Sequence, residues 1–142
     1  MRSFRVSVAE TVDEITERII GKGLDSFNEA HVGPDTSRVA WVVARDDAGS
    51  VIGGLKGVSI WTWFLIDWLW VHEAARGYKL GSELIGTAED VARERGCKHA
   101  YLYTFSFQAP DFYRKLGYLE FARQDDFPPG HSRHWLRKTL VE

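Results

Sequence analysis

The chain of 142 residues contains one cysteine, four prolines and almost no excess of charge. The single cysteine, Cys97, excludes a disulfide within the chain and a metal site built from several cysteines. The 18 basic and 20 acidic residues give a formal net charge of -2. A chain this close to neutrality lacks the basic surface that is typical of nucleic-acid-binding proteins, so we expect no nucleic-acid partner.

Long hydrophobic runs are also missing. The longest apolar stretch, residues 57–71, contains Asp67 and is shorter than the roughly 20 residues that a membrane-spanning helix needs. The first ten residues, MRSFRVSVAE, lack the apolar segment of a secretory signal. These absences predict a soluble protein that has no membrane partner and is located in the cytoplasm, a reducing compartment.

What the sequence does contain fits one domain over residues 1–142. Hydrophobic residues make up 44% of the chain and charged residues 27%, and a chain of this length can bury one core without disulfides. Alternation along the chain predicts that Trp68 and Trp70 lie in the core. We favour the core for Trp61 and Trp63 as well, with a pocket wall or a dimer contact as the alternative.

Hydrophobic periodicity predicts an α+β or mixed α/β fold with one open sheet. Strands are predicted at residues 4–8, 39–44, 51–60, 65–71, 100–105, 118–122 and 134–140. Capping signals and helical periodicity predict helices at residues 11–30, with an interruption at Gly21 and Gly23, at residues 80–95 and at residues 110–116.

The most informative segment joins the strand at residues 65–71 to the next helix. It reads Leu69-Trp70-Val71-His72-Glu73-Ala74-Ala75-Arg76-Gly77-Tyr78-Lys79-Leu80-Gly81-Ser82. The first N–H groups of a helix have no acceptor within it, and together with the helix dipole they favour an anion. Glycines let a ligand approach the backbone, and Arg76 and Lys79 add positive charge. The segment therefore fits a pyrophosphate cradle, but a helix start with two structural glycines has the same pattern.

A second motif, Phe112-Tyr113-Arg114-Lys115-Leu116-Gly117-Tyr118, completes a family pattern. In this order the two motifs resemble those of the GNAT superfamily of acetyl-CoA-dependent N-acetyltransferases. The first is similar to the family's Gln/Arg-x-x-Gly-x-Gly/Ala pyrophosphate loop, and the second to its Phe-Tyr-x-Lys-x-Gly-Phe/Tyr segment. The resemblance covers nearly the whole chain and implies a central mixed, mostly antiparallel sheet with helices on both faces.

The resemblance implies that acetyl-CoA is bound as a co-substrate. The residues that would bind it are Leu69, Trp70, Val71, Arg76, Gly77, Tyr78, Lys79, Leu80, Gly81, Ser82 and Gln108. Lys79 departs from the pattern, because the family has its first loop glycine there; its Cβ would crowd the pyrophosphate, or its ammonium would contact a phosphate. Gln108 is a second departure from the pattern. Many relatives have an asparagine near this position, and that asparagine contacts the pantetheine arm.

Direct transfer of the acetyl group to an amine, which the resemblance implies, needs a base. An alkyl ammonium has a pKa of about 10.4 and is almost fully protonated at pH 7. Asp67 is the candidate, since it is the only charged residue between Lys56 and Glu73, and a carboxylate within an apolar strand has either a partner or a task. A structural hydrogen bond is the alternative role, and His72 and Glu73 are second candidates for the base.

The leaving thiolate also needs an acid, and the resemblance assigns this role to Tyr113. Packing of the aromatic ring on the sheet is the alternative role. The resemblance further implies that a backbone N–H of residues 69–71 binds the oxyanion of the tetrahedral intermediate. No metal is expected, because the spacing of His131 and His134 in a strand-like region is poor for ligands.

Several functions remain open at this point. The leading one is N-acetylation of a primary amine on a small molecule. The alternatives are acetylation of a protein lysine or N-terminus, a CoA-binding module without turnover, and a nucleotide-binding protein. A homodimer is implied by the resemblance alone.

Overall fold

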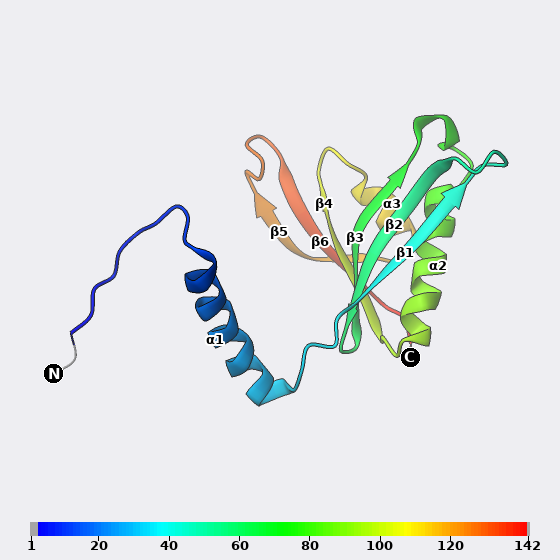
Figure 1. Cartoon of the computed structure of the whole chain (residues 1–142). Coiled ribbons are helices and arrows are strands. Elements are labelled where there is room, and N and C mark those ends of the chain that lie inside the picture. The colour runs from blue at the N-terminus through cyan, green and yellow to red at the C-terminus, as the bar shows by residue number, and fades with distance from the viewer. Residues whose placement is uncertain (1–2, 142) are drawn as a thin grey trace. The chain divides into compact units, whose positions relative to one another are not determined.

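The computed structural model of the chain describes residues 3–141, in two units of which the smaller ends at Asp35 (Figure 1). The smaller unit contains one helix, α1 (Glu14–Val32), which begins after Asp13 because Oδ1 of this residue accepts a 2.7 Å hydrogen bond from the N–H of Thr16. Gly21 and Gly23 lie inside α1, so the predicted interruption is wrong. A glycine weakens a helix without ending it.

The strand predicted at residues 4–8 is wrong as well. These residues have no regular secondary structure, and the side chains of Phe4, Val6 and Val8 are exposed. Alternation of apolar and polar residues describes the two faces of a strand. It does not supply the neighbouring strand whose N–H and C=O groups the backbone needs.

The larger unit is built on a six-stranded sheet with the strand order β1-β2-β3-β4-β6-β5 (Figure 1). The strands are β1 (Arg38–Arg45), β2 (Val51–Ile60), β3 (Trp63–Val71), β4 (His99–Phe105), β5 (Leu119–Asp125) and β6 (Ser132–Thr139). Only β3 and β4 are parallel, and every other neighbouring pair is antiparallel. The predicted mixed, mostly antiparallel sheet is therefore confirmed, with strand bounds within a few residues of those expected.

Two helices and one 3-10 turn complete this unit: α2 (Leu80–Glu94), η1 (Glu73–Ala75) and α3 (Pro110–Lys115). The core lies between α2 and the sheet, where Leu84, Ile85 and Ala88 pack against strand residues such as Leu55 and Phe64. Side chains of α3 pack against the same core. Within residues 36–141 both helices thus cover one face, and helix cover of the second face stays a prediction.

A β-bulge in β3 decides which side chains face the core. Gly57 of β2 pairs with Ile66 and Lys56 pairs with Trp68, so Asp67 between them has no partner on β2. The extra residue reverses the alternation: Phe64 and Ile66 are buried before it, and Leu69 and Val71 pack against the core after it.

The tryptophans were expected in the core, and for three of them this is wrong. Trp61 lies in the turn between β2 and β3 and is 57% exposed, while Trp68 and Trp70 are 59% and 51% exposed on the sheet face opposite α2. Trp63 is half-buried, and its ring stacks on that of His99 with a centroid distance of 4.5 Å. Alternation places Trp68 and Trp70 on one face correctly, but it does not say whether that face is covered.

Candidate active site

The site begins where the two parallel strands separate. Residues Trp63–Leu65 of β3 pair with residues His99–Tyr101 of β4. Beyond these residues the two strands diverge (Figure 1). One edge of β3 remains paired with β2, so the other edge presents backbone groups to the gap. A cleft with a volume of about 940 Å³ occupies this opening.

The cleft brings together almost all residues that the sequence singled out. Those that line it are Asp67, Leu69, Trp70, Val71, Arg76, Gly77, Lys79, Leu80, Gly81, Ser82, Gln108 and Tyr113. Tyr78 does not line the cleft; its side chain is 79% exposed and borders a smaller hollow beside His72 and Glu83.

The loop before α2 has the geometry of an anion cradle. Gly77 and Lys79 have φ values of 89° and 59°, so the chain turns through the left-handed region twice just before the helix. The N–H groups of Leu80, Gly81 and Ser82 form the first turn of α2 and have no acceptor within the helix. These N–H groups are available to phosphate oxygens, for which the helix dipole adds further attraction.

Arginine and histidine side chains hold the loop in shape. The Nε of Arg76 donates a 3.3 Å hydrogen bond to the carbonyl of Val71, at the end of β3. Nδ1 of His72 accepts a 3.0 Å hydrogen bond from the N–H of Ala74 and caps η1. His72 and Glu73, the second candidates for the base, do not line the cleft.

Asp67 lines the cleft at the bulge. Its side chain is 27% exposed, and its Oδ2 lies 3.9 Å from Nζ of Lys56, which also lies over the ring of Trp68. The sequence predicted a carboxylate with either a partner or a catalytic task; the structure shows a half-buried carboxylate with a distant cation. This arrangement leaves an oxygen of Asp67 available to an ammonium group in the cleft.

Tyr113 enters the cleft from α3. Burial raises the pKa of its phenol, so the hydroxyl is protonated at neutral pH and can donate a proton. The ring contacts those of Phe112 and Tyr118 edge-on, with centroid distances of 5.1 and 6.3 Å.

Gln108 uses its side-chain oxygen to close the turn after β4. Its Oε1 accepts hydrogen bonds from Oγ1 of Thr104 at 3.1 Å and from the N–H of Phe105 at 3.0 Å. The amide NH₂ group is then the part of the side chain that remains for a ligand in the cleft.

Sequence reasoning missed the wall that β4 and the following turn contribute. The unpredicted residues of the cleft are Ile66, Trp68, Ala75, Leu102, Tyr103, Thr104, Phe105, Phe107, Ala109 and Phe112. The alternation of aromatic residues within 100–105 was the available signal, because it predicts an aromatic face on this strand.

Three further findings concern the described part of the chain. Among residues 3–141 there is no group of three or more His, Cys, Asp or Glu side chains that could hold a metal ion. Cys97 is 1% exposed, and burial raises the pKa of its thiol, which disfavours a nucleophilic thiolate. None of the helices in the described part of the chain is both long and apolar enough to span a membrane.

A mixed sheet that opens between its parallel strands, with a helix N-terminus at the mouth of the opening, is the arrangement expected for an acetyltransferase that binds CoA. The sequence profile of the Acetyltransferase (GNAT) family matches residues 11–118. The chain therefore belongs to the GNAT family and is an acetyl-CoA-dependent N-acetyltransferase.

Named relatives agree with this assignment. The chain is 46% identical over 98 residues to the blasticidin-S acetyltransferase of Streptomyces morookaense, covering 68% of this chain and 72% of that protein. It is 32% identical over 133 residues to an acetyltransferase of Agrobacterium fabrum, covering 94% and 97% of the two chains. The crystal structure of an acetyltransferase from Bacillus cereus is 32% identical, has a TM-score of 0.85 and covers 94% of this chain and 97% of that one.

Proposed function

We propose that the protein transfers the acetyl group of acetyl-CoA to a primary amine of a small molecule. The observation that carries the proposal is that one cleft connects the anion cradle at the start of α2 with Asp67 and Tyr113. The name of the Streptomyces relative, a blasticidin-S acetyltransferase, supports a small-molecule acceptor for that protein. Small-molecule acetylation is thus the version of the family's reaction that has the most support.

The residues of the cleft fit the cofactor. The N–H groups at the start of α2, with Arg76 and Lys79, would bind the pyrophosphate. The free edge of β3 at residues 69–71 would direct a backbone N–H to the thioester carbonyl, where negative charge develops. Acetyl-CoA supplies the thioester carbon that the amine attacks.

Asp67 would accept a proton from the acceptor amine, and Tyr113 would donate one to the leaving thiolate. Asp67 accepts a proton from the acceptor ammonium, and the neutral nitrogen attacks the thioester carbonyl carbon to form the C–N bond. When the tetrahedral intermediate collapses, the C–S bond breaks, the phenol of Tyr113 donates its proton to the thiolate, and the nitrogen releases its second proton to solvent to give the neutral amide. Exchange with solvent then returns Tyr113 to its neutral form and removes the proton from Asp67.

The test is a panel of small amines with acetyl-CoA, in which release of free CoA thiol is measured. The buried Cys97 does not add to this signal while the protein is folded. We expect thiol release with a subset of the small amines. Stabilisation by CoA without release from any amine would instead identify a CoA-binding module, and release with peptide lysines alone would identify a protein acetyltransferase.

Two predictions from the sequence concern the protein beyond its cleft. The homodimer is tested by sedimentation of the purified chain, and the cytoplasmic location by fractionation of cells that produce it.

A further inference from the structure

Arg133 on β6 is held among three aromatic rings. Its Cζ lies 4.9 Å from the ring centroid of Tyr103, 4.5 Å from that of Phe127 and 4.9 Å from that of Trp135. Its Nε donates a 3.0 Å hydrogen bond to Oε1 of Gln124. The ring contacts and this hydrogen bond fix the guanidinium in one position.

The charge of Arg133 is not neutralised. Within residues 3–141 it forms no ion pair, and its two terminal nitrogens donate no hydrogen bond. Arg123 on the neighbouring strand β5 differs in this respect, because it pairs with Asp125 at 2.6 Å. Stacking on rings engages the faces of a guanidinium and leaves its N–H groups, which lie in the plane, for an acceptor.

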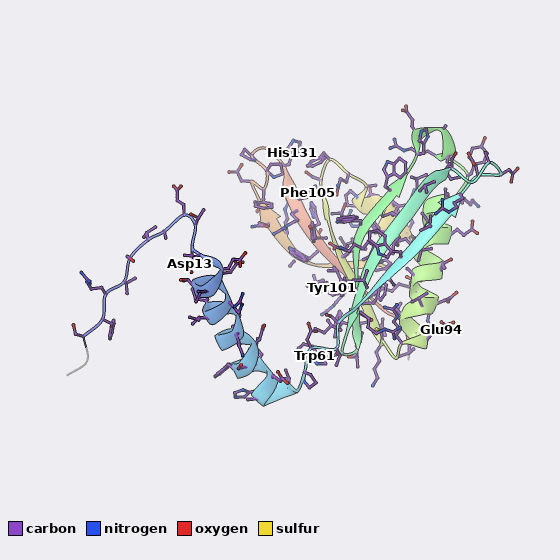
Figure 2. All side chains as sticks on the ribbon, in the orientation of Figure 1. Asp13, Trp61, Glu94, Tyr101, Phe105 and His131 are labelled. Atoms are coloured by element: carbon purple, nitrogen blue, oxygen red, sulfur yellow. The ribbon has the colours of Figure 1, made fainter. Side chains whose placement is uncertain are left out.

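The guanidinium lies beside the cleft. Arg133 pairs with Phe105 across β4 and β6, and directly opposed residues project on the same face of a sheet. Phe105 and Tyr103 both line the cleft, and Phe105 stacks on Phe107, which lines it too. Figure 2 shows Phe105 at the end of β4, near His131 in the turn before β6.

We propose that Arg133 binds a carboxylate of the acceptor and so determines specificity, with the rings of Tyr103, Phe105 and Phe107 holding the body of the molecule. The inference rests on the proposed function. A planar guanidinium with free N–H groups matches a carboxylate bidentately, and aromatic surroundings strengthen the interaction by excluding water.

The strand order sets the length of such an acceptor. Asp67 is on β3 and Arg133 on β6, with β4 between them and β3 diverging from β4 before Asp67, so at least two strand spacings, or about 10 Å, separate them. An acceptor that reaches both residues therefore carries its amine and its carboxylate about 10 Å apart or more. The simple α-amino acids, in which one carbon joins the two groups, are too short.

The experiment compares matched acceptors in the same assay of thiol release. The long pair is the tripeptide glycyl-phenylalanyl-glycine, which spans about 10 Å when extended, and its C-terminal amide. The short pair is glycine and glycinamide. We expect the wild-type kcat/KM to favour the acid over the amide at least about tenfold for the tripeptide, with no such preference for the short pair.

Variants test whether Arg133 causes the preference for the acid over the amide. Arg133→Gln is expected to remove the preference for the acid while the KM for acetyl-CoA is unchanged, and Arg133→Lys to restore only part of it. Arg137→Gln is the matched control, since Arg137 lies on the same strand, over the ring of Phe121, and should keep the wild-type preference.

Other results would overturn the inference. Equal rates for acid and amide in the wild type, turnover of simple amines without any turnover of the tripeptide, or a preference that survives in Arg133→Gln would each do so. A change in sedimentation of Arg133→Gln with the preference intact would assign the arginine to an interface instead. Absence of thiol release from every amine would reject the proposed function itself, and this inference with it.

Discussion

Phe112 on α3 lies so close to Gly81 on α2 that a Cβ at position 81 would be 3.1 Å from Cζ of the ring. This contact joins the two helices that line the cleft. Gly81 contributes one of the free N–H groups of the anion cradle, and Phe112 precedes Tyr113, the candidate acid. The position of the ring thus links the cofactor loop to the helix that carries the acid.

Gly81→Ala is expected to weaken binding of acetyl-CoA. The new methyl group must displace the ring of Phe112 by a few tenths of an ångström, and we expect the KM for acetyl-CoA to rise about fivefold, which corresponds to about 1 kcal/mol. Gly86→Ala in the same helix is the control, because its Cβ would meet no atom within 4 Å. It should leave the KM unchanged and stabilise the protein by about 0.5–1 kcal/mol. An unchanged KM in both variants would contradict the prediction.

Lys79 is the one loop position that departs from the family pattern. Lys79→Gly tests both the backbone strain at this position and the contribution of the ammonium to cofactor binding. Lys79 has a φ of 59°, a conformation that costs a residue with a Cβ about 1 kcal/mol and a glycine almost nothing. We expect a higher melting temperature together with a KM for acetyl-CoA that rises severalfold, since an ammonium beside the cradle is lost.

Lys79→Met is the matched control for this position, because it keeps the Cβ and removes the charge. It should lose the same affinity without any gain in stability, and the loss should shrink at high salt. Wild-type affinity in both variants would mean that the ammonium takes no part in binding.

The cofactor loop could be predicted from the sequence because its signals are local. A strand, two glycines, two basic residues and an amphipathic helix follow one another between residues 69 and 94, and each signal concerns its own backbone. The β-bulge at Asp67 could not be predicted, because residues 63–71 are apolar on both faces and no alternation marks the position of the extra residue. The exposure of Trp68 follows from the same bulge.

The second wall of the cleft depends on contacts between distant segments. Tyr103 and Phe105 lie across the gap from β3 only because β3 and β4 stop pairing after Leu65 and Tyr101. A strand pattern gives the faces of one strand and says nothing about where its pairing with another ends. The error at residues 4–8 has the same origin, since alternation was present and a partner strand was not.

Asp67→Asn is expected to lower kcat about 100-fold or more while the KM for acetyl-CoA stays within about twofold. The amide keeps the shape of the side chain and removes the proton acceptor. Lys56→Met is the control, because it breaks the same 3.9 Å ion pair from the other side. If Lys56→Met lowers kcat as much as Asp67→Asn does, the effect comes from the ion pair, and Asp67 is not the base.

Tyr113→Phe is expected to lower kcat about 100-fold without changing the melting temperature, because the ring and its packing remain. Burial raises the pKa of the phenol, so the proton donor persists above the ordinary tyrosine value of about 10. In the wild type, the loss of kcat from this group should therefore begin only above pH 10, as measured in a pH-rate profile. Wild-type turnover in Tyr113→Phe would leave the residue with a packing role alone.

A buried polar network lies behind the cleft. The hydroxyl of Tyr118 donates a 2.8 Å hydrogen bond to Oε2 of Glu89 on α2, and Nζ of Lys138 on β6 lies 3.0 Å from the same carboxylate. Tyr118 is fully buried and Glu89 is 6% exposed. Burial, with the Glu89 charge as a second cause, raises the pKa of Tyr118 far above its ordinary value.

This network should make folding stability depend on pH in the alkaline range. The folded protein keeps the phenolic proton of Tyr118, whereas the unfolded chain loses it near pH 10, so its contribution is complete below that pH and falls above it. From pH 10 to 11 the free energy of unfolding, measured with urea, should fall by about 1 kcal/mol more in the wild type than in Tyr118→Phe. Tyr78→Phe, which removes an exposed ring hydroxyl, should keep the wild-type slope. The same pH dependence in the wild type and in Tyr118→Phe would contradict the prediction. It would mean that the phenol of Tyr118 has the same pKa in the folded and unfolded states.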